Sequence, residues 1–178
     1  YPTATYHTNG IIVFGDGAGS VVDTYIYNNY IHGCTGSGSP TGFIYHTFGV
    51  ATSGSKGTIF NNLLVGTGAC TDANALLFFN AAGGNPLGPH RIYNNTLVGG
   101  GRGHEMYGDT TTLYTYKNNI FVGGSIGSTY HYLSQNGIED FPALTVNNND
   151  YWQGRNFGPW NWHGTWSTFT AWKDGCNT

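Results

Sequence analysis

Charged side chains and long apolar runs are scarce in this 178-residue chain, and both shortages exclude classes of function. Six basic and nine acidic residues make up 8% of the chain, against about a quarter in an average globular domain. With a formal net charge of −3, the chain is neither a basic nucleic-acid binder nor a polybasic membrane-surface protein. No apolar run approaches the ~18 residues of a membrane-spanning helix, so no membrane insertion is expected.

Glycine, asparagine and aromatic residues are abundant instead. The chain has 29 glycines and 19 asparagines, and its aromatic content of 16% is too high for a disordered chain. The good helix formers Ala, Leu, Glu and Lys are few, whereas Thr and Tyr, which favour strands, are common. The composition therefore predicts a soluble, all-β and extracellular domain.

A repeat predicts the architecture. In each of five segments, β-branched or aromatic residues precede an Asn pair and apolar residues follow it. The first Asn of each pair is residue 28, 61, 94, 118 or 148. Asn tolerates the left-handed backbone of a tight bend between two strands. The second Asn of each pair is expected to hydrogen-bond along the stack as a structural ladder. The ladder residues are Asn29, Asn62, Asn95, Asn119 and Asn149.

A further strand is predicted in each repeat, at residues 9–15, 41–46, 74–80 and 103–108. Short strands, glycine turns and a period of 24–33 residues favour a right-handed parallel β-helix of about five coils, over residues 1–151. Residues 152–178 hold all five tryptophans and a predicted short helix at 167–175. This tail is expected to cap the open end of the last coil.

The segments IYNNYIHG, IFNNLLVG, RIYNNTLVGG and KNNIFVGG resemble coils of the pectate-lyase-like superfamily of right-handed β-helix proteins. The tail, from NDYW to FTAW, is similar to that of secreted microbial members, and the resemblance covers residues 7–175. It implies a secreted protein that binds or processes polysaccharide, and coils preceding Tyr1 are expected. Activity stays open, because the superfamily includes polysaccharide lyases, glycoside hydrolases and non-catalytic proteins.

Catalytic groups are weakly indicated. No two basic residues share a predicted row of the stack, which counts against lyase chemistry. Asp16 and Asp109 would lie three coils apart, too far for a glycosidase pair. His46 as base with Tyr107 as acid is the least unfavourable alternative, although two coils separate them. The remaining aspartates, at 23, 72, 140, 150 and 174, are expected near loops, and His32, His90, His131 and His163 in turns.

The outer face of the first predicted sheet is the expected binding surface. Aligning Gly10 with Gly42 places one ring per coil in an outward row, with Asn80 in the next row, suited to a neutral polysaccharide. A shift of one residue would instead turn these rings into the core. The alternative function is a non-catalytic structural or adhesive module that stacks end to end through its open N-terminal coil. The row contains Phe14, His46, Phe78 and Tyr107.

Three smaller expectations concern covalent and metal chemistry. Cys34 and Cys70 follow the Asn pairs of adjacent coils, so a disulfide between them is expected, and no CxxC or Cys–His cluster indicates zinc. No cofactor is expected. The acidic pair Glu139–Asp140, in a predicted loop, is a weak candidate for a Ca²⁺ site. The triplet Asn94–Asn95–Thr96 matches a glycosylation sequon but falls in the predicted ladder, so no glycan is expected there.

Overall fold

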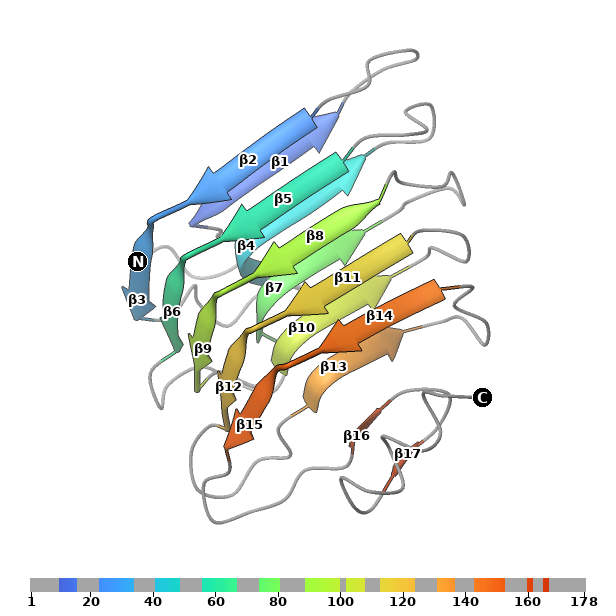
Figure 1. The fold of residues 1–178 in the computed structure, drawn as a ribbon. Coiled ribbons are helices and arrows are strands. Elements are labelled where there is room, and N and C mark those ends of the chain that lie inside the picture. Colours follow the sequence, from blue (N-terminus) through green and yellow to red (C-terminus); the bar gives the residue numbers. More distant parts are fainter. Residues whose placement is uncertain are drawn as a thin grey trace.

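The computed structural model is all-β, and its strands form three sheets of stacked parallel strands. It describes residues 10–15, 23–33, 41–48, 56–66, 74–80, 89–99, 102–107, 113–123, 131–136, 143–152, 160–161 and 165–166. Each repeat contributes one strand to each sheet, as Figure 1 shows. The arrangement is compatible with the predicted β-helix.

The first sheet contains the strands that lie between the Asn-pair segments. Its order is β1-β4-β7-β10-β13, followed by a short antiparallel pair, β16 and β17. The prediction located the first four strands to within about two residues but omitted β13 and the final pair. The strands are β1 (Ile11–Gly15), β4 (Thr41–Phe48), β7 (Asn74–Asn80), β10 (Arg102–Tyr107), β13 (His131–Asn136), β16 (Trp160–Asn161) and β17 (Thr165–Trp166).

The second and third sheets contain the strands that enter and leave each Asn pair. The second consists of β2 (Asp23–Tyr27), β5 (Lys56–Phe60), β8 (His90–Tyr93), β11 (Leu113–Lys117) and β14 (Ala143–Asn147). The third consists of β3 (Tyr30–Gly33), β6 (Leu63–Gly66), β9 (Thr96–Val98), β12 (Ile120–Val122) and β15 (Asp150–Trp152).

Left-handed asparagines make the corner between these two sheets. The first Asn of every pair has a φ between 52° and 57°, as the sequence predicts. This conformation turns the chain within two residues, so a strand of the second sheet passes directly into one of the third. Asn29, Asn62, Asn95, Asn119 and Asn149 follow these turns and lie one per coil in a row, here called the asparagine row.

The core fills the space between the three sheets with one layer of side chains per coil. Ile59, Leu64 and Ile44 are fully buried representatives of the second, third and first sheets and belong to one cluster. Phenols also enter this core: Tyr116 is fully buried, and burial, followed by the nearby Tyr114 and Tyr151, raises its pKa well above 10.0.

Several predicted features of the tail and loops lie outside the described residues. They are Cys34, Cys70, Cys176, the segment 167–175, Trp162 and Trp172. Of the other tryptophans, Trp152 ends β15 and is exposed, and Trp160 pairs with Trp166 across β16 and β17. β16 joins the first sheet beside β13, where Asn161 pairs with Ser134.

Candidate functional site

The register of the first sheet corrects the predicted aromatic row. Phe14 pairs with Thr47, and Thr47 with Asn80, which in turn pairs with Tyr107. His46 lies in the preceding row, with Val13 and Phe79, and Phe78 lies one row further back, with Tyr45. Three of the five predicted binding residues thus share a row, and His46 and Phe78 do not join them.

The error came from aligning Gly10 with Gly42. Ile11 pairs with Ile44, so Gly10 comes level with Phe43, one residue beyond the predicted partner. Gly42, Phe43 and Ile44 are all buried although they are consecutive in β4. Because alternate residues of a strand face opposite sides, both sides of β4 are covered at this point. The start of β4 therefore offers no open face to a ligand.

The predicted catalytic candidates are not brought together. His46 in β4 comes level with Met106 through Phe79, whereas Tyr107 comes level with Thr47, so the two lie in different rows of strands two positions apart in the sheet. Asp16 and Asp109 lie outside the described residues.

The histidines expected in turns occupy strands instead. His32 lies in β3, His131 begins β13, and His90 begins β8. His90 is fully buried: its Nδ1 accepts a hydrogen bond of 2.9 Å from the Gly57 backbone, and its ring stacks on Tyr114. A buried ring of this kind fits a core position, because its Nδ1 atom is satisfied by the neighbouring strand. His163 lies outside the described residues.

The asparagine row is a continuous chain of hydrogen bonds. The Nδ2 group of each Asn donates to the Oδ1 atom of the next, over 2.9, 2.9, 3.0 and 2.8 Å from Asn29 to Asn149. The backbone N–H of the same residue donates to the same oxygen, as from Asn62 to Asn95 at 3.0 Å. The remaining Nδ2 hydrogen reaches a carbonyl of the preceding coil, such as Ile26 for Asn62, at 2.9 Å. These amides are already occupied by one another, so the row offers little to a ligand.

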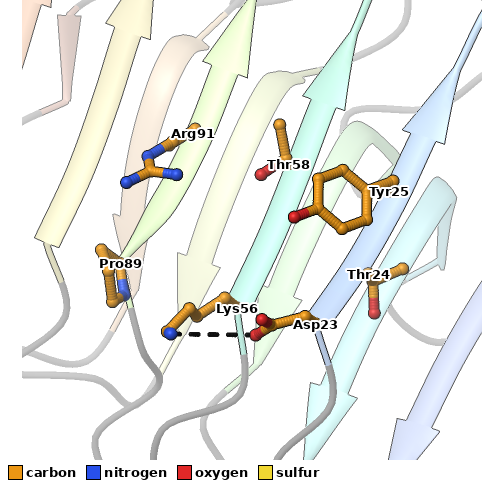
Figure 2. A pocket seen from close by; sticks show the side chains of 7 residues that line it. All are labelled: Asp23, Thr24, Tyr25, Lys56, Thr58, Pro89 and Arg91. Atoms are coloured by element: carbon orange, nitrogen blue, oxygen red, sulfur yellow. Dashed lines mark ion pairs between the residues drawn. The ribbon is translucent and has the colours of Figure 1, made fainter.

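An open hollow of about 120 Å³ lies on the outer face of the second sheet, where β2, β5 and β8 begin. Figure 2 shows the face of the Tyr25 ring and the ends of the Lys56 and Arg91 side chains around it. Tyr25 is 64% exposed, so this ring face is accessible. The lining residues are Asp23, Thr24, Tyr25, Lys56, Thr58, Pro89 and Arg91.

Charge within the hollow is unbalanced. Lys56 Nζ lies 3.9 Å from Asp23 Oδ1, and both side chains are about half exposed. Arg91 is exposed and has no carboxylate partner within the described part of the chain. Among the described lining residues, two cations and one carboxylate give a net charge of +1. The hollow thus combines an exposed guanidinium, a flat ring and the Thr58 hydroxyl.

The neighbouring aromatic row presents less ring surface. Tyr27 and Phe60 follow the hollow on the same outer face, and their rings stack at 4.8 Å with planes only 9° apart. Rings stacked in this way turn their faces toward each other and their edges toward solvent. Tyr25 is therefore the better platform for a flat ligand, since a sugar ring packs against an aromatic face.

Sequence reasoning missed this hollow although its signal was present. Asp23 and Lys56 both lie five residues before the first Asn of their pairs (28 − 23 and 61 − 56), and Tyr25, Thr58 and Arg91 all lie three before. Counting back from the Asn pairs would have placed these side chains together. The expectation that Asp23 lies near a loop overlooked its position at the start of β2, opposite Lys56.

Metal and membrane features are not found in the described part of the chain. Within it, no three His, Cys, Asp or Glu side chains come close enough together to hold a metal ion. Nor do the described residues include a helix of the length and apolar character that crossing a membrane requires.

Comparison of the chain with models of protein families, with curated proteins and with solved structures finds no match.

Proposed function

We propose that the chain is a secreted right-handed parallel β-helix of the pectate-lyase-like kind that binds an acidic polysaccharide at the hollow on its second sheet. The three stacked parallel sheets and the corner formed by each Asn pair support the fold. The hollow lined by Tyr25, Lys56 and Arg91 carries the functional part of the proposal.

The chemistry of the lining suits one charged sugar unit. The planar guanidinium of Arg91 matches a carboxylate or sulfate group, with which it forms two parallel hydrogen bonds. The exposed face of Tyr25 packs against the apolar face of the sugar ring. Thr58 and the Lys56–Asp23 pair supply donors and acceptors for hydroxyl groups.

The overall charge of the chain does not oppose this role. Its formal net charge is −3, but the screening length at physiological salt is only ~8 Å. Distant carboxylates are therefore screened, and an anionic sugar seated in the hollow experiences mainly the local charge of +1. This differs from the neutral polysaccharide expected on the first sheet.

Binding is better supported than cleavage. Glycosidases use two carboxyl groups, whereas the described lining residues supply one, Asp23. Asp23 is already paired with Lys56 and is half exposed, which suits a group that orients hydroxyls.

Calorimetric titration with acidic and neutral oligosaccharides of matched length tests the proposal. The wild-type chain should prefer the acidic ligand, and Arg91→Gln should weaken its binding about 10- to 100-fold, because hydrogen bonds to a charged group contribute ~1.5–3 kcal/mol. Tyr25→Ala should weaken binding of both ligands. Lys117→Gln, an exposed cation elsewhere on the same sheet, is the matched control for charge, and Tyr30→Ala is the control for an exposed ring on another sheet. Equal losses in Arg91→Gln and Lys117→Gln would refute a site at the hollow.

Self-association is the second candidate function. Ile12 of the first sheet, Tyr25 and Tyr27 of the second and Tyr30 of the third are all at least half exposed, so the first coil carries exposed apolar side chains on each of its three strands. A further copy packing there would continue the sheets and generate a fibre. Sedimentation at rising protein concentration tests this: growing assemblies support it, and a constant monomer contradicts it.

A further inference from the structure

The asparagine turns present two kinds of amide, and only one kind is occupied by the fold. Asn94, the first of its pair, is exposed, and its backbone has a φ of 52°. Asn95, the second, is 1% exposed and uses its side chain in the asparagine row. The two neighbours therefore differ in what a covalent modification would disturb.

The glycosylation sequon uses the exposed member. In Asn94–Asn95–Thr96 the acceptor is Asn94, and it is the one Asn-x-Ser/Thr triplet in the 178 residues. The sequence-based expectation of no glycan assumed that the acceptor lies in the ladder. The structure corrects this assumption, because the row passes through Asn95.

The turn leaves room for a large substituent. On the neighbouring coils the equivalent residues, Asn61 and Asn118, are also exposed, so the corner between the second and third sheets is an open ridge. The backbone N–H of Asn94 donates to Lys117 O at 3.0 Å, and this bond holds the turn without its side chain. Thr96 pairs with Leu63 and Ile120 in the third sheet, so the threonine of the sequon is held in β9.

We propose that Asn94 is an N-glycosylation site, which carries a glycan on this ridge when the chain passes through a secretory pathway with an oligosaccharyltransferase. The Nδ2 atom forms a bond to the anomeric carbon of a lipid-pyrophosphate-linked oligosaccharide. The bond from that carbon to the pyrophosphate oxygen breaks, the lipid pyrophosphate leaves, and Nδ2 loses one proton to a base. Nothing is oxidised or reduced. The folded chain then accommodates the glycan because the Asn94 side chain is exposed and lies outside the core cluster of the described residues.

This inference is independent of the polysaccharide site, and a designed second site makes its test sharp. Leu63→Thr converts Asn61–Asn62–Leu63 into a sequon in the equivalent turn of the preceding coil, where Asn61 has a φ of 55°. Leu63 is 39% exposed on the outer side of β6, a position that accepts a β-branched polar residue. A variant in a geometrically matched turn therefore reports whether the corner itself tolerates a glycan.

The experiment expresses the full chain behind a signal peptide in eukaryotic secretory cells, with glycan occupancy measured by mobility and peptide mass spectrometry before and after peptide-N-glycosidase treatment. The wild type should carry one glycan, Asn94→Gln and Thr96→Ala none, Thr96→Ser one, and Leu63→Thr two. The glycosylated wild type and its enzymatically deglycosylated form should melt within a few degrees of each other. A secreted wild-type chain without a glycan overturns the proposal, whether or not Leu63→Thr is modified. A glycosylated chain that loses its far-ultraviolet spectrum overturns it too, because the ridge would then not accommodate the sugar.

Discussion

Replacing Asn62 with alanine tests whether the asparagine row stabilises the stack. Asn62 is 2% exposed and lies in an interior coil. Its Oδ1 atom accepts from the backbone N–H and the Nδ2 group of Asn29, at 3.1 and 2.9 Å. Its Nδ2 group reaches Asn95 Oδ1, Ile26 O and Phe60 O, at 2.9, 2.9 and 3.1 Å. The substitution therefore removes five hydrogen-bond contacts. Their partner atoms, which belong to three successive coils, lose the contact with Asn62.

The magnitude follows from the cost of such groups. A hydrogen bond contributes a net ~0.5–1.5 kcal/mol, but the five contacts of Asn62 share donors and acceptors, so about 3 kcal/mol is expected. Asn149 at the other end of the row has three contacts within the described chain and is only partly buried, so its replacement should cost about 1 kcal/mol. For a chain of this size, the difference of ~2 kcal/mol corresponds to ~4–8 °C in melting temperature.

Urea and thermal unfolding followed by circular dichroism measure these losses in Asn62→Ala and Asn149→Ala. Asn61→Gly is the matched control, because glycine keeps the left-handed turn and removes an exposed side chain. It should change stability by no more than ~1 kcal/mol, the conformational-entropy cost of an added glycine. Equal destabilisation by Asn62→Ala and Asn149→Ala would refute a stabilising role that depends on burial within the row.

Three further predictions address other parts of the stack. Gly99→Ala should lower the free energy of unfolding in urea by ~2–5 kcal/mol, because the φ of Gly99 is +70° and a Cβ atom there would lie 2.3 Å from Gly66 O. Gly33→Ala, where a Cβ atom would meet open space, should lower it by only ~1–2 kcal/mol, and similar losses for the two variants would contradict the steric argument. Because burial raises the pKa of Tyr116 in the folded chain, its contribution to stability is complete below pH 10.0 and falls as the pH rises above that value toward the folded-state pKa. Tyr116→Phe should therefore reduce the loss of stability at alkaline pH. An unchanged dependence of stability on alkaline pH would refute this. Lys56→Met should change the melting temperature little, because the half-exposed ion pair with Asp23 contributes less than ~1 kcal/mol, and a large loss would show that the pair is structurally important.

The corner of the coil was predictable because its causes are local. The first Asn of a pair favours a left-handed turn, and the second supplies a side-chain amide that can hydrogen-bond along the stack. Neither property depends on residues far away in the chain. Counting from that corner would also have given the first-sheet register. Ile11, Ile44 and Leu77 form one row and all lie 17 residues before the first Asn of their pairs (28 − 11, 61 − 44 and 94 − 77).

The remaining coils were not predictable by this count. His104 and Leu133 continue the row, but they lie 14 and 15 residues before their pairs (118 − 104 and 148 − 133), because these coils are shorter. The strand β13 reads HYLSQN, which lacks the apolar alternation of a half-buried strand. It forms by pairing with β10, a tertiary effect that overrides weak local preference. The hollow lies in the first three coils, where the count does apply, and it was missed because the residues before successive Asn pairs were not compared with one another.

The constant corner makes coil length an adjustable quantity. Successive Asn pairs are 33, 33, 24 and 30 residues apart, yet the first Asn keeps a φ between 52° and 57° throughout. The bonds between amides stay between 2.8 and 3.0 Å in the same coils. Nine residues can therefore be lost between two corners without altering either one (33 − 24). For protein engineering, the stack is a scaffold in which foreign peptide segments can be grafted between the third and first sheets while the Asn corners hold the remaining strands in alignment.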